Sequence, residues 1–106
     1  MGFYTTKDYQ NKIEPAFEQL RKVGYFAEQD FMCCQSCGWA SVPEEQEDKA
    51  VFYHEQDKEN LKFGSVMLAW SGNGSEIVNI LSEHINGFSV KVNWDGLDSS
   101  RIEIKF

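Results

Sequence analysis

Val66-Met67-Leu68-Ala69-Trp70 is an uncharged apolar run, and the prediction of the fold starts from this run. A short run of this kind predicts a buried strand, and we expect this one to be the central strand of a sheet. A helix follows, because Asn73 and Glu76 form a capping-box-like pair at its start. Gly87 is expected to end this helix. Its apolar stripe consists of Ile77, Ile80, Leu81, His84 and Ile85.

Two stretches near the C-terminus alternate apolar and polar residues. The apolar positions are Phe88, Val90, Val92 and Trp94 in the first stretch, and Ile102, Ile104 and Phe106 in the second. A period of two residues predicts half-buried strands, and Asp95-Gly96 between them is typical of a hairpin turn. We therefore expect the chain to end in an antiparallel hairpin.

An amphipathic helix is predicted near the N-terminus, with Gly24 as its stop. Pro15 lies inside this helix, where it removes a backbone hydrogen bond and crowds the preceding turn. We therefore expect a kink or break near residues 10–14 and a straighter helix over residues 15–23. The apolar residues of the helix are Tyr9, Ile13, Ala16, Phe17, Leu20 and Val23.

The middle of the chain has two further apolar runs. We interpret residues 31–34 as a buried strand that brings thiols to the end of the sheet, although so short a run is also compatible with a helix. Residues 50–53 predict a strand from their β-branched and aromatic side chains. Residues 54–61 predict one or two helical turns, and residues 41–49 predict an exposed loop.

Together these elements predict an α+β fold. Two main helices pack on one face of a roughly five-stranded mixed or antiparallel sheet, which ends in the C-terminal hairpin. The chain has 106 residues, 42% of them hydrophobic, and no linker or repeat divides it, so we expect a single domain over residues 1–106.

The formal charge of −7 is concentrated in residues 28–59, where only Lys49 and Lys58 oppose nine acids. A negative field repels phosphate backbones, so nucleic-acid binding is disfavoured, whereas a basic protein or a cation would be attracted. The simpler interpretation is that an acidic loop keeps a small protein soluble. The acids are Glu28, Asp30, Glu44, Glu45, Glu47, Asp48, Glu55, Asp57 and Glu59.

A cytoplasmic location is expected. No apolar run approaches the roughly 20 residues that a membrane helix needs, and residues 1–9 have no hydrophobic signal-peptide segment. An odd number of cysteines in such a chain favours reduced thiols or a metal site over a disulfide framework.

All three cysteines lie in the stretch Cys33-Cys34-Gln35-Ser36-Cys37-Gly38-Trp39. The gap of two residues between Cys34 and Cys37, with glycine next, lets a tight turn point two sulfurs at one tetrahedral ion. Cys33 or His54 would add ligands to a zinc ion. A structural zinc site usually has two such pairs, and this chain has one.

A thiol enzyme is a second hypothesis for these residues. Cys37 would attack the substrate, His54 would act as the base, and Asp57, one helical turn further on, would orient the imidazole. Nearby carboxylates raise the pKa of a thiol, and this segment is the most negative in the chain, so the local field argues against catalysis.

Packing is the third hypothesis. Free cysteine is among the most buried residue types, so Cys33 and Cys34 would act as small hydrophobic side chains and Cys37 as a turn residue. A redox pair of Cys34 and Cys37 lacks the strand that leads straight into a long helix in thioredoxin-like proteins.

Several motifs together resemble one family. They are Cys33-Cys34-x-x-Cys37-Gly38, then Val51-Phe52-Tyr53-His54-Glu55-Gln56-Asp57, then Gly87 with Trp94-Asp95-Gly96 and Arg101-Ile102. Over residues 31–104 the chain resembles a group of small bacterial proteins described only as a domain of unknown function. Because no activity is assigned to that group, the resemblance implies a bacterial intracellular protein and no particular chemistry.

We interpret the chain as a binding protein rather than an enzyme, with Cys37, His54 and Asp57 at its candidate site. One version is an interaction or inhibitor module whose acidic surface engages a basic protein, as immunity proteins do. The alternative is a zinc protein or metal-dependent hydrolase that uses Cys33, Cys34, Cys37 and His54. The thiol enzyme is the third.

Overall fold

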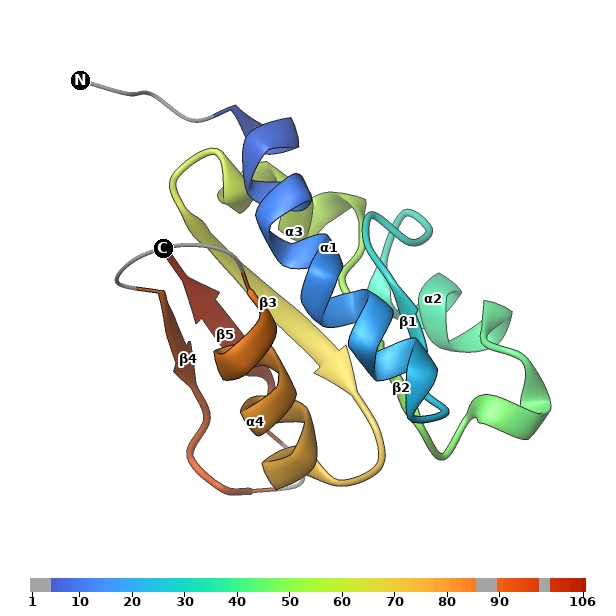
Figure 1. Cartoon of the computed structure of the whole chain (residues 1–106). Helices are drawn as coiled ribbons and strands as arrows, with labels where there is room; N and C mark the ends of the chain where they lie inside the picture. Colours follow the sequence, from blue (N-terminus) through green and yellow to red (C-terminus); the bar gives the residue numbers. More distant parts are fainter. Residues whose placement is uncertain (1–4, 86–89, 98–99) are drawn as a thin grey trace.

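The centre of the sheet is β3 (Ser65–Trp70), as the apolar run at residues 66–70 predicts. The computed structural model describes residues 5–85, 90–97 and 100–106. Its sheet has five strands in the order β1-β2-β3-β5-β4 (Figure 1). β1 and β2 run parallel and the other neighbours run antiparallel, so the predicted α+β fold with a mixed sheet is confirmed. The other strands are β1 (Phe26–Glu28), β2 (Ala50–Phe52), β4 (Lys91–Asn93) and β5 (Ile102–Lys105).

The main core lies on one face of this sheet. Successive side chains of a strand point to opposite faces, so Val66 and Leu68 of β3 share a face and are fully buried. Helices α1 (Thr6–Lys22) and α4 (Gly74–His84) cover this face, and Figure 1 shows both in front of the strands. The prediction of two main helices on one face of the sheet is therefore confirmed.

Helix α1 runs unbroken through Pro15, so a break near residues 10–14 is wrong, and the alternative of a kink there stays a prediction. Pro15 and Asn11 are both exposed. The carbonyl group that a proline leaves without a partner, four residues earlier, therefore lies on the solvent side of the helix, where water can hydrate it. No helix in the described part of the chain is both long and apolar enough to cross a membrane.

A hydrogen-bond network joins α1 to the end of β2. Gln10 Nε2 donates to the Tyr53 hydroxyl at 3.0 Å, and that hydroxyl donates to Gln29 Oε1 at 2.9 Å. Gln29 and Arg21 donate to the two carboxylate oxygens of Glu14, at 2.9 and 2.7 Å. Burial raises the pKa of Glu14, but the hydrogen bonds from Arg21 and Gln29 outweigh it and hold this pKa below its ordinary value of 4.5.

The start of α4 is as predicted, whereas its predicted end lies outside the described residues. Asn73 Oδ1 accepts a hydrogen bond from the Glu76 N–H at 3.1 Å, which caps the helix. Gly87, the expected stop, and Phe88, the expected first apolar residue of the next strand, are not among the described residues.

The predicted C-terminal strand pair is present. β4 and β5 are antiparallel, as expected, and their register places Asn93 opposite Glu103. The Asp95 carboxylate accepts hydrogen bonds from the Leu97 N–H and the Ser100 hydroxyl.

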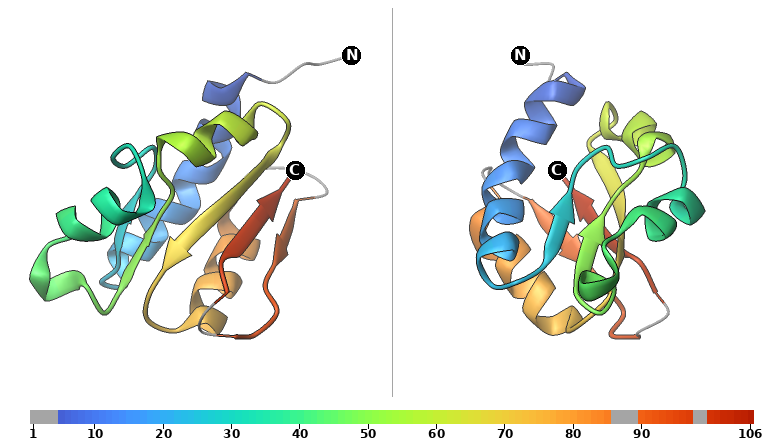
Figure 2. Two further views of the ribbon diagram at one scale, coloured as in Figure 1. Left: turned by 180° about the vertical axis from the view of Figure 1, so that it is seen from behind. Right: turned by 90° about the vertical axis from the view of Figure 1, so that its right-hand side faces the viewer.

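The opposite face of the sheet is covered near β1 and β2 by α2 (Gln35–Ser41), a helix that the sequence does not predict. Figure 2 shows α1 and α2 on opposite sides of these two strands. A short 3-10 helix (Glu44–Gln46) follows within the predicted loop, and α3 (Glu55–Leu61) connects β2 to β3 as predicted. A second, smaller core forms under α2 from Val42, Ala50, Phe52 and Ala69, with Phe26, Phe31 and Trp39 packed against it.

Residues 31–34 do not form the predicted strand. Asp30 and Met32 have φ angles of 53° and 64°, which lie in the left-handed region and interrupt any extended backbone. The apolar character of this run reflects the packing of Phe31 into the second core. The strand that precedes the cysteines is β1, and an irregular loop connects it to α2.

Candidate metal centre

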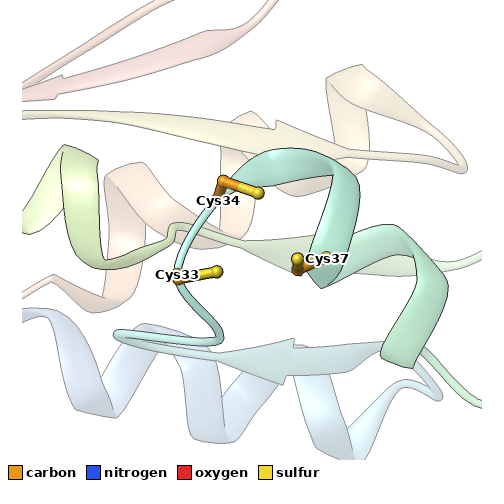
Figure 3. Close-up of side chains that lie close together, drawn as sticks. All are labelled: Cys33, Cys34 and Cys37. Atoms are coloured by element: carbon orange, nitrogen blue, oxygen red, sulfur yellow. The ribbon is translucent and has the colours of Figure 1, made fainter.

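The three cysteines come together at the start of α2. Their sulfur atoms all lie within 4.8 Å of one another, and Figure 3 shows the three side chains turned toward a common space. Cys33 is exposed, and Cys34 and Cys37 are half-buried. None of the three is a core residue, so the packing hypothesis does not account for their positions.

The loop before the cysteines is tied to the end of β2. The Phe31 N–H donates to the Tyr53 carbonyl at 2.8 Å, and the Glu55 N–H donates to the Met32 carbonyl at 3.0 Å. Met32 adopts its left-handed conformation between these two contacts. For a bulky residue this conformation is uncommon and must be held by its surroundings. The hydrogen bonds therefore fix the direction in which the chain enters Cys33.

Close packing of α2 on β2 fixes the position of Cys37. Gly38, the next residue, is buried against the Phe52 ring, and a Cβ atom at Gly38 would lie 2.4 Å from Phe52 Cε2. The Trp39 and Phe52 rings meet edge to face, with their centroids 4.9 Å apart. Only glycine permits this approach, so the glycine after the cysteine pair serves helix packing as well as the turn that the sequence suggests.

The three thiols interact with one another electrostatically. The backbone N–H and the thiol of Cys37 lower the pKa of the Cys34 thiol below its ordinary value. Interaction with the thiols of Cys34 and Cys33 raises the pKa of Cys37 to about 11. Cys34 is therefore the first of this pair to lose its proton as the pH rises.

The spacing of the sulfurs fits a thiophilic metal ion. A zinc ion binds sulfur at about 2.3 Å, so two sulfurs of a tetrahedral site lie roughly 3.8 Å apart. Sulfurs within 4.8 Å of one another reach that spacing by small side-chain rotations. Thiolate ligands suit zinc, copper(I) and iron–sulfur clusters better than magnesium or calcium.

His54 lies at the start of α3 and contacts Asp57. Its Nδ1 accepts a hydrogen bond from the Asp57 N–H at 3.3 Å, and its Nε2 lies 3.1 Å from Asp57 Oδ2. The expected contact between Asp57 and the imidazole is thus present. Among the described residues, the group of closely spaced ligand atoms contains the three cysteines and not His54. The imidazole has Asp57 as its partner in this structure.

The sequence gives no sign of the second partner of Asp57, which is Arg101. The Arg101 guanidinium donates to both carboxylate oxygens of Asp57 and, at 2.8 Å, to the Met67 carbonyl. Arg101 Nε is buried and has no hydrogen-bond partner among the described residues. Because Arg101 and Asp57 are 44 positions apart, no local pattern connects them. The contact anchors α3 to β3 and to the residue before β5.

These contacts also bear on the thiol-enzyme hypothesis. Both ring nitrogens of His54 are engaged by Asp57, and the pKa of Cys37 is raised rather than lowered. A thiol nucleophile requires the opposite shift. The arrangement therefore disfavours Cys37 as a nucleophile with His54 as its base.

The acidic residues of the segment 28–59 are almost all on the surface. Asp57 is the buried one, with 7% of its area exposed. The exposed acids flank the cysteine loop in the sequence on both sides. They are Glu28, Asp30, Glu44, Glu45, Glu47, Asp48, Glu55 and Glu59.

Comparison with known proteins identifies a family. A family model described as a domain of unknown function (DUF6891) matches residues 3–106 of the chain. No curated protein and no solved structure matches it. The resemblance to a family of unknown function is confirmed at that level, and the bacterial source stays a prediction.

Proposed function

The chain belongs to the DUF6891 family, whose function is unknown, and we propose from its own residues that it binds a thiophilic metal ion, zinc first among them, through Cys33, Cys34 and Cys37. The observation that carries the proposal is the approach of three sulfurs to within 4.8 Å of one another. Three thiolates give zinc three of its four ligands, and a water molecule at the fourth position would leave the ion open to exchange.

The surroundings of the cysteines favour a cation. A bound divalent ion replaces thiol protons, and the resulting thiolates attract it directly. The exposed acids of the segment 28–59 add a negative field that raises the local concentration of cations. Exposure of Cys33 places one ligand within reach of an incoming ion or of its carrier.

Elemental analysis of untagged protein purified without chelator tests the proposal, together with a thiol titration on the same sample. We expect about one zinc per chain and thiols that react only after chelator is added. Cys34→Ser should weaken zinc binding on the order of 100-fold or more, the upper end of what loss of a ligand-supporting group costs. Ser36→Ala, in the same turn, is the matched control and should bind normally.

A cobalt(II) titration separates the ligand sets. Replacement of any one cysteine should remove one sulfur from the coordination sphere and weaken the thiolate-to-metal absorption bands. His54→Gln tests the imidazole as the fourth ligand, because it would alter the spectrum only if His54 leaves Asp57 to bind the ion. Three freely titrating thiols and no bound metal, even after zinc is supplied, would rule out the proposed function.

A second candidate function is an interaction module for a basic protein. It is supported by the exposure of eight of the nine acids in residues 28–59. Complementary charge speeds association and makes it sensitive to salt. Binding of a basic protein should therefore weaken steeply as the salt concentration rises, and it should weaken when Glu44, Glu45 and Glu47 are changed together to glutamine. Affinity that is equal at low and high salt would count against this candidate.

A further inference from the structure

The cysteines differ in which pairs can form a disulfide. Disulfide-bonded residues have Cα atoms about 4.4–6.8 Å apart. Neighbouring Cα atoms are about 3.8 Å apart across a trans peptide bond, and the described part of the chain contains no cis peptide. Cys33 and Cys34 are therefore too close along the backbone to pair without distortion.

Cys34 and Cys37 meet the requirement. Cys34 is the N-cap of α2, and Cys37 is three residues further along the same turn. Helix geometry places Cα atoms at this separation about 5 Å apart, well within the disulfide range. Their sulfurs already lie within 4.8 Å of each other, and neither residue is buried.

The packing of α2 holds this pair in place. Gly38 seats the helix on Phe52, and the loop before it is bonded to the end of β2. Oxidation of the pair therefore needs side-chain rotation and no movement of the helix. Cys33 precedes the N-cap and lies outside this turn.

We infer that, in the metal-free protein, Cys34 and Cys37 form a redox-active dithiol that reduces small disulfides, while Cys33 remains a free, exposed thiol. The inference uses residues of the proposed metal site, and it does not require that a metal ever binds.

The reaction balances as a thiol–disulfide exchange. One thiolate of the pair attacks a sulfur of the substrate R–S–S–R, forming a mixed disulfide and releasing one RS⁻, which takes up a proton. The second cysteine of the pair, after losing its proton, attacks the protein sulfur of the mixed disulfide and releases the second RS⁻. Two electrons pass from the dithiol to the substrate, which leaves as two RSH molecules, and the protein gains one disulfide.

The oxidised pair and a bound ion exclude each other. A disulfide between Cys34 and Cys37 removes two of the three sulfur ligands, and one thiol is too few to hold zinc. Bound zinc, in turn, should protect the pair from oxidation. The redox state of a surrounding thiol pool would therefore control whether the chain carries metal.

The test uses the full chain, reduced and freed of metal with chelator, in buffers that range from reduced to oxidised glutathione. After acid quenching, alkylation and mass analysis count the free thiols and locate the disulfide. We expect the thiols of Cys34 and Cys37 to be lost together, with a Cys34–Cys37 disulfide and no glutathione retained on either residue. The exposed Cys33 should be found alkylated or, at high oxidised glutathione, as a mixed disulfide with glutathione.

Variants assign the roles of the three thiols. Cys33→Ser should lose both remaining thiols at the same glutathione ratio as the wild type. Cys37→Ser should accumulate a stable mixed disulfide with glutathione, because its second step is removed. Circular dichroism of each oxidised sample checks that the fold persists, and the wild-type protein alone suffices for the decision if a variant does not fold.

Free thiols at both Cys34 and Cys37 in fully oxidised glutathione would overturn the inference. Glutathione retained on either of these two residues of the wild type, or a disulfide between Cys33 and another cysteine of the chain, would also overturn it. The two proposals fail separately. A chain that binds zinc without forming the disulfide keeps the proposed function and loses this inference. A chain that forms the disulfide and never binds zinc keeps this inference and loses the proposed function.

Discussion

Replacement of Gly38 by alanine tests the link between the fold and the metal centre. The added Cβ would lie 2.4 Å from Phe52 Cε2 and 2.8 Å from Cζ, whereas an ordinary contact begins near 3.4 Å. Relief therefore needs a displacement of about 1 Å. The Phe52 ring has little room to give, because it is fully buried and packs edge to face with Trp39 and Phe31.

The expected loss of stability follows from two opposing effects. Overpacking of a well-packed core costs about 1–3 kcal/mol. Alanine is a better helix former than glycine, which offsets this cost by about 1 kcal/mol. The overlap of about 1 Å with a fully buried ring places Gly38→Ala in the upper part of the overpacking range, about 2–3 kcal/mol, so we expect it to lower the free energy of unfolding by about 1–2 kcal/mol. Because Cys37 precedes this residue, the same displacement should weaken zinc binding roughly 5–30-fold, the factor that 1–2 kcal/mol represents.

Urea unfolding followed by tryptophan fluorescence measures the stability, and competition with a chromophoric chelator measures the zinc affinity. Ala40→Gly is the matched control, because Ala40 is exposed on the same helix. It should cost about 1 kcal/mol through helix propensity and leave zinc affinity unchanged. If Gly38→Ala matched the wild type in both assays, the description of α2 as seated on Phe52 and holding Cys37 in place would be refuted.

Three further predictions concern charged groups and thiols. Asp57→Ala should destabilise the chain by about 2–4 kcal/mol in urea unfolding, since it leaves Arg101 without its carboxylate partner. This loss is toward the lower end of the cost of breaking a buried ion pair, because the Arg101 side chain is 28% exposed. The double variant Asp57→Ala/Arg101→Met should recover part of that loss. If the losses of stability in the two single variants simply added in the double variant, the two residues would not interact. Glu14 has a lowered pKa, so its hydrogen bonds add stability above about pH 4.5, and this stability is lost as the pH falls through the pKa of the folded state. Glu14→Gln should therefore flatten the acid side of the curve of stability against pH. An unchanged curve would contradict a stabilising role for the Glu14 carboxylate. In metal-free protein, iodoacetamide should modify Cys34 before Cys37 at neutral pH, because the pKa of Cys34 is lowered and that of Cys37 is raised to about 11; peptide mapping that found Cys37 modified first would reverse this order.

The predicted parts of the fold are those with a clear local pattern. β3, the capped start of α4 and the C-terminal strand pair each have an apolar periodicity or a capping pair that needs no distant contact. Helix α2 was not predictable in this way. Its sequence has no apolar stripe, and its position depends on the fit of Gly38 to Phe52, a residue on another element.

The same distinction applies to the candidate site. Cysteine spacing predicted that sulfurs could meet, and the i,i+3 relation predicted the contact between His54 and Asp57. The partnership of Asp57 with Arg101 joins residues from distant parts of the chain and has no local signal. The left-handed residues Asp30 and Met32 were also missed, because their conformation is imposed by hydrogen bonds to Tyr53 and Glu55.

The edge strand β1 has a consequence for how the molecule opens. It is three residues long, and among the described strands it neighbours β2 alone. The two strands pair in parallel, and the chain between them carries the cysteines. Parallel pairing closes a long loop for few hydrogen bonds, so we expect β1, the loop and α2 to open together as one low-stability unit while β3 and β5 stay protected from hydrogen exchange. A cross-link or an ion at the cysteines would then act on this local opening equilibrium, slowing amide exchange in residues 26–46 without changing the slowest-exchanging amides of the central strands.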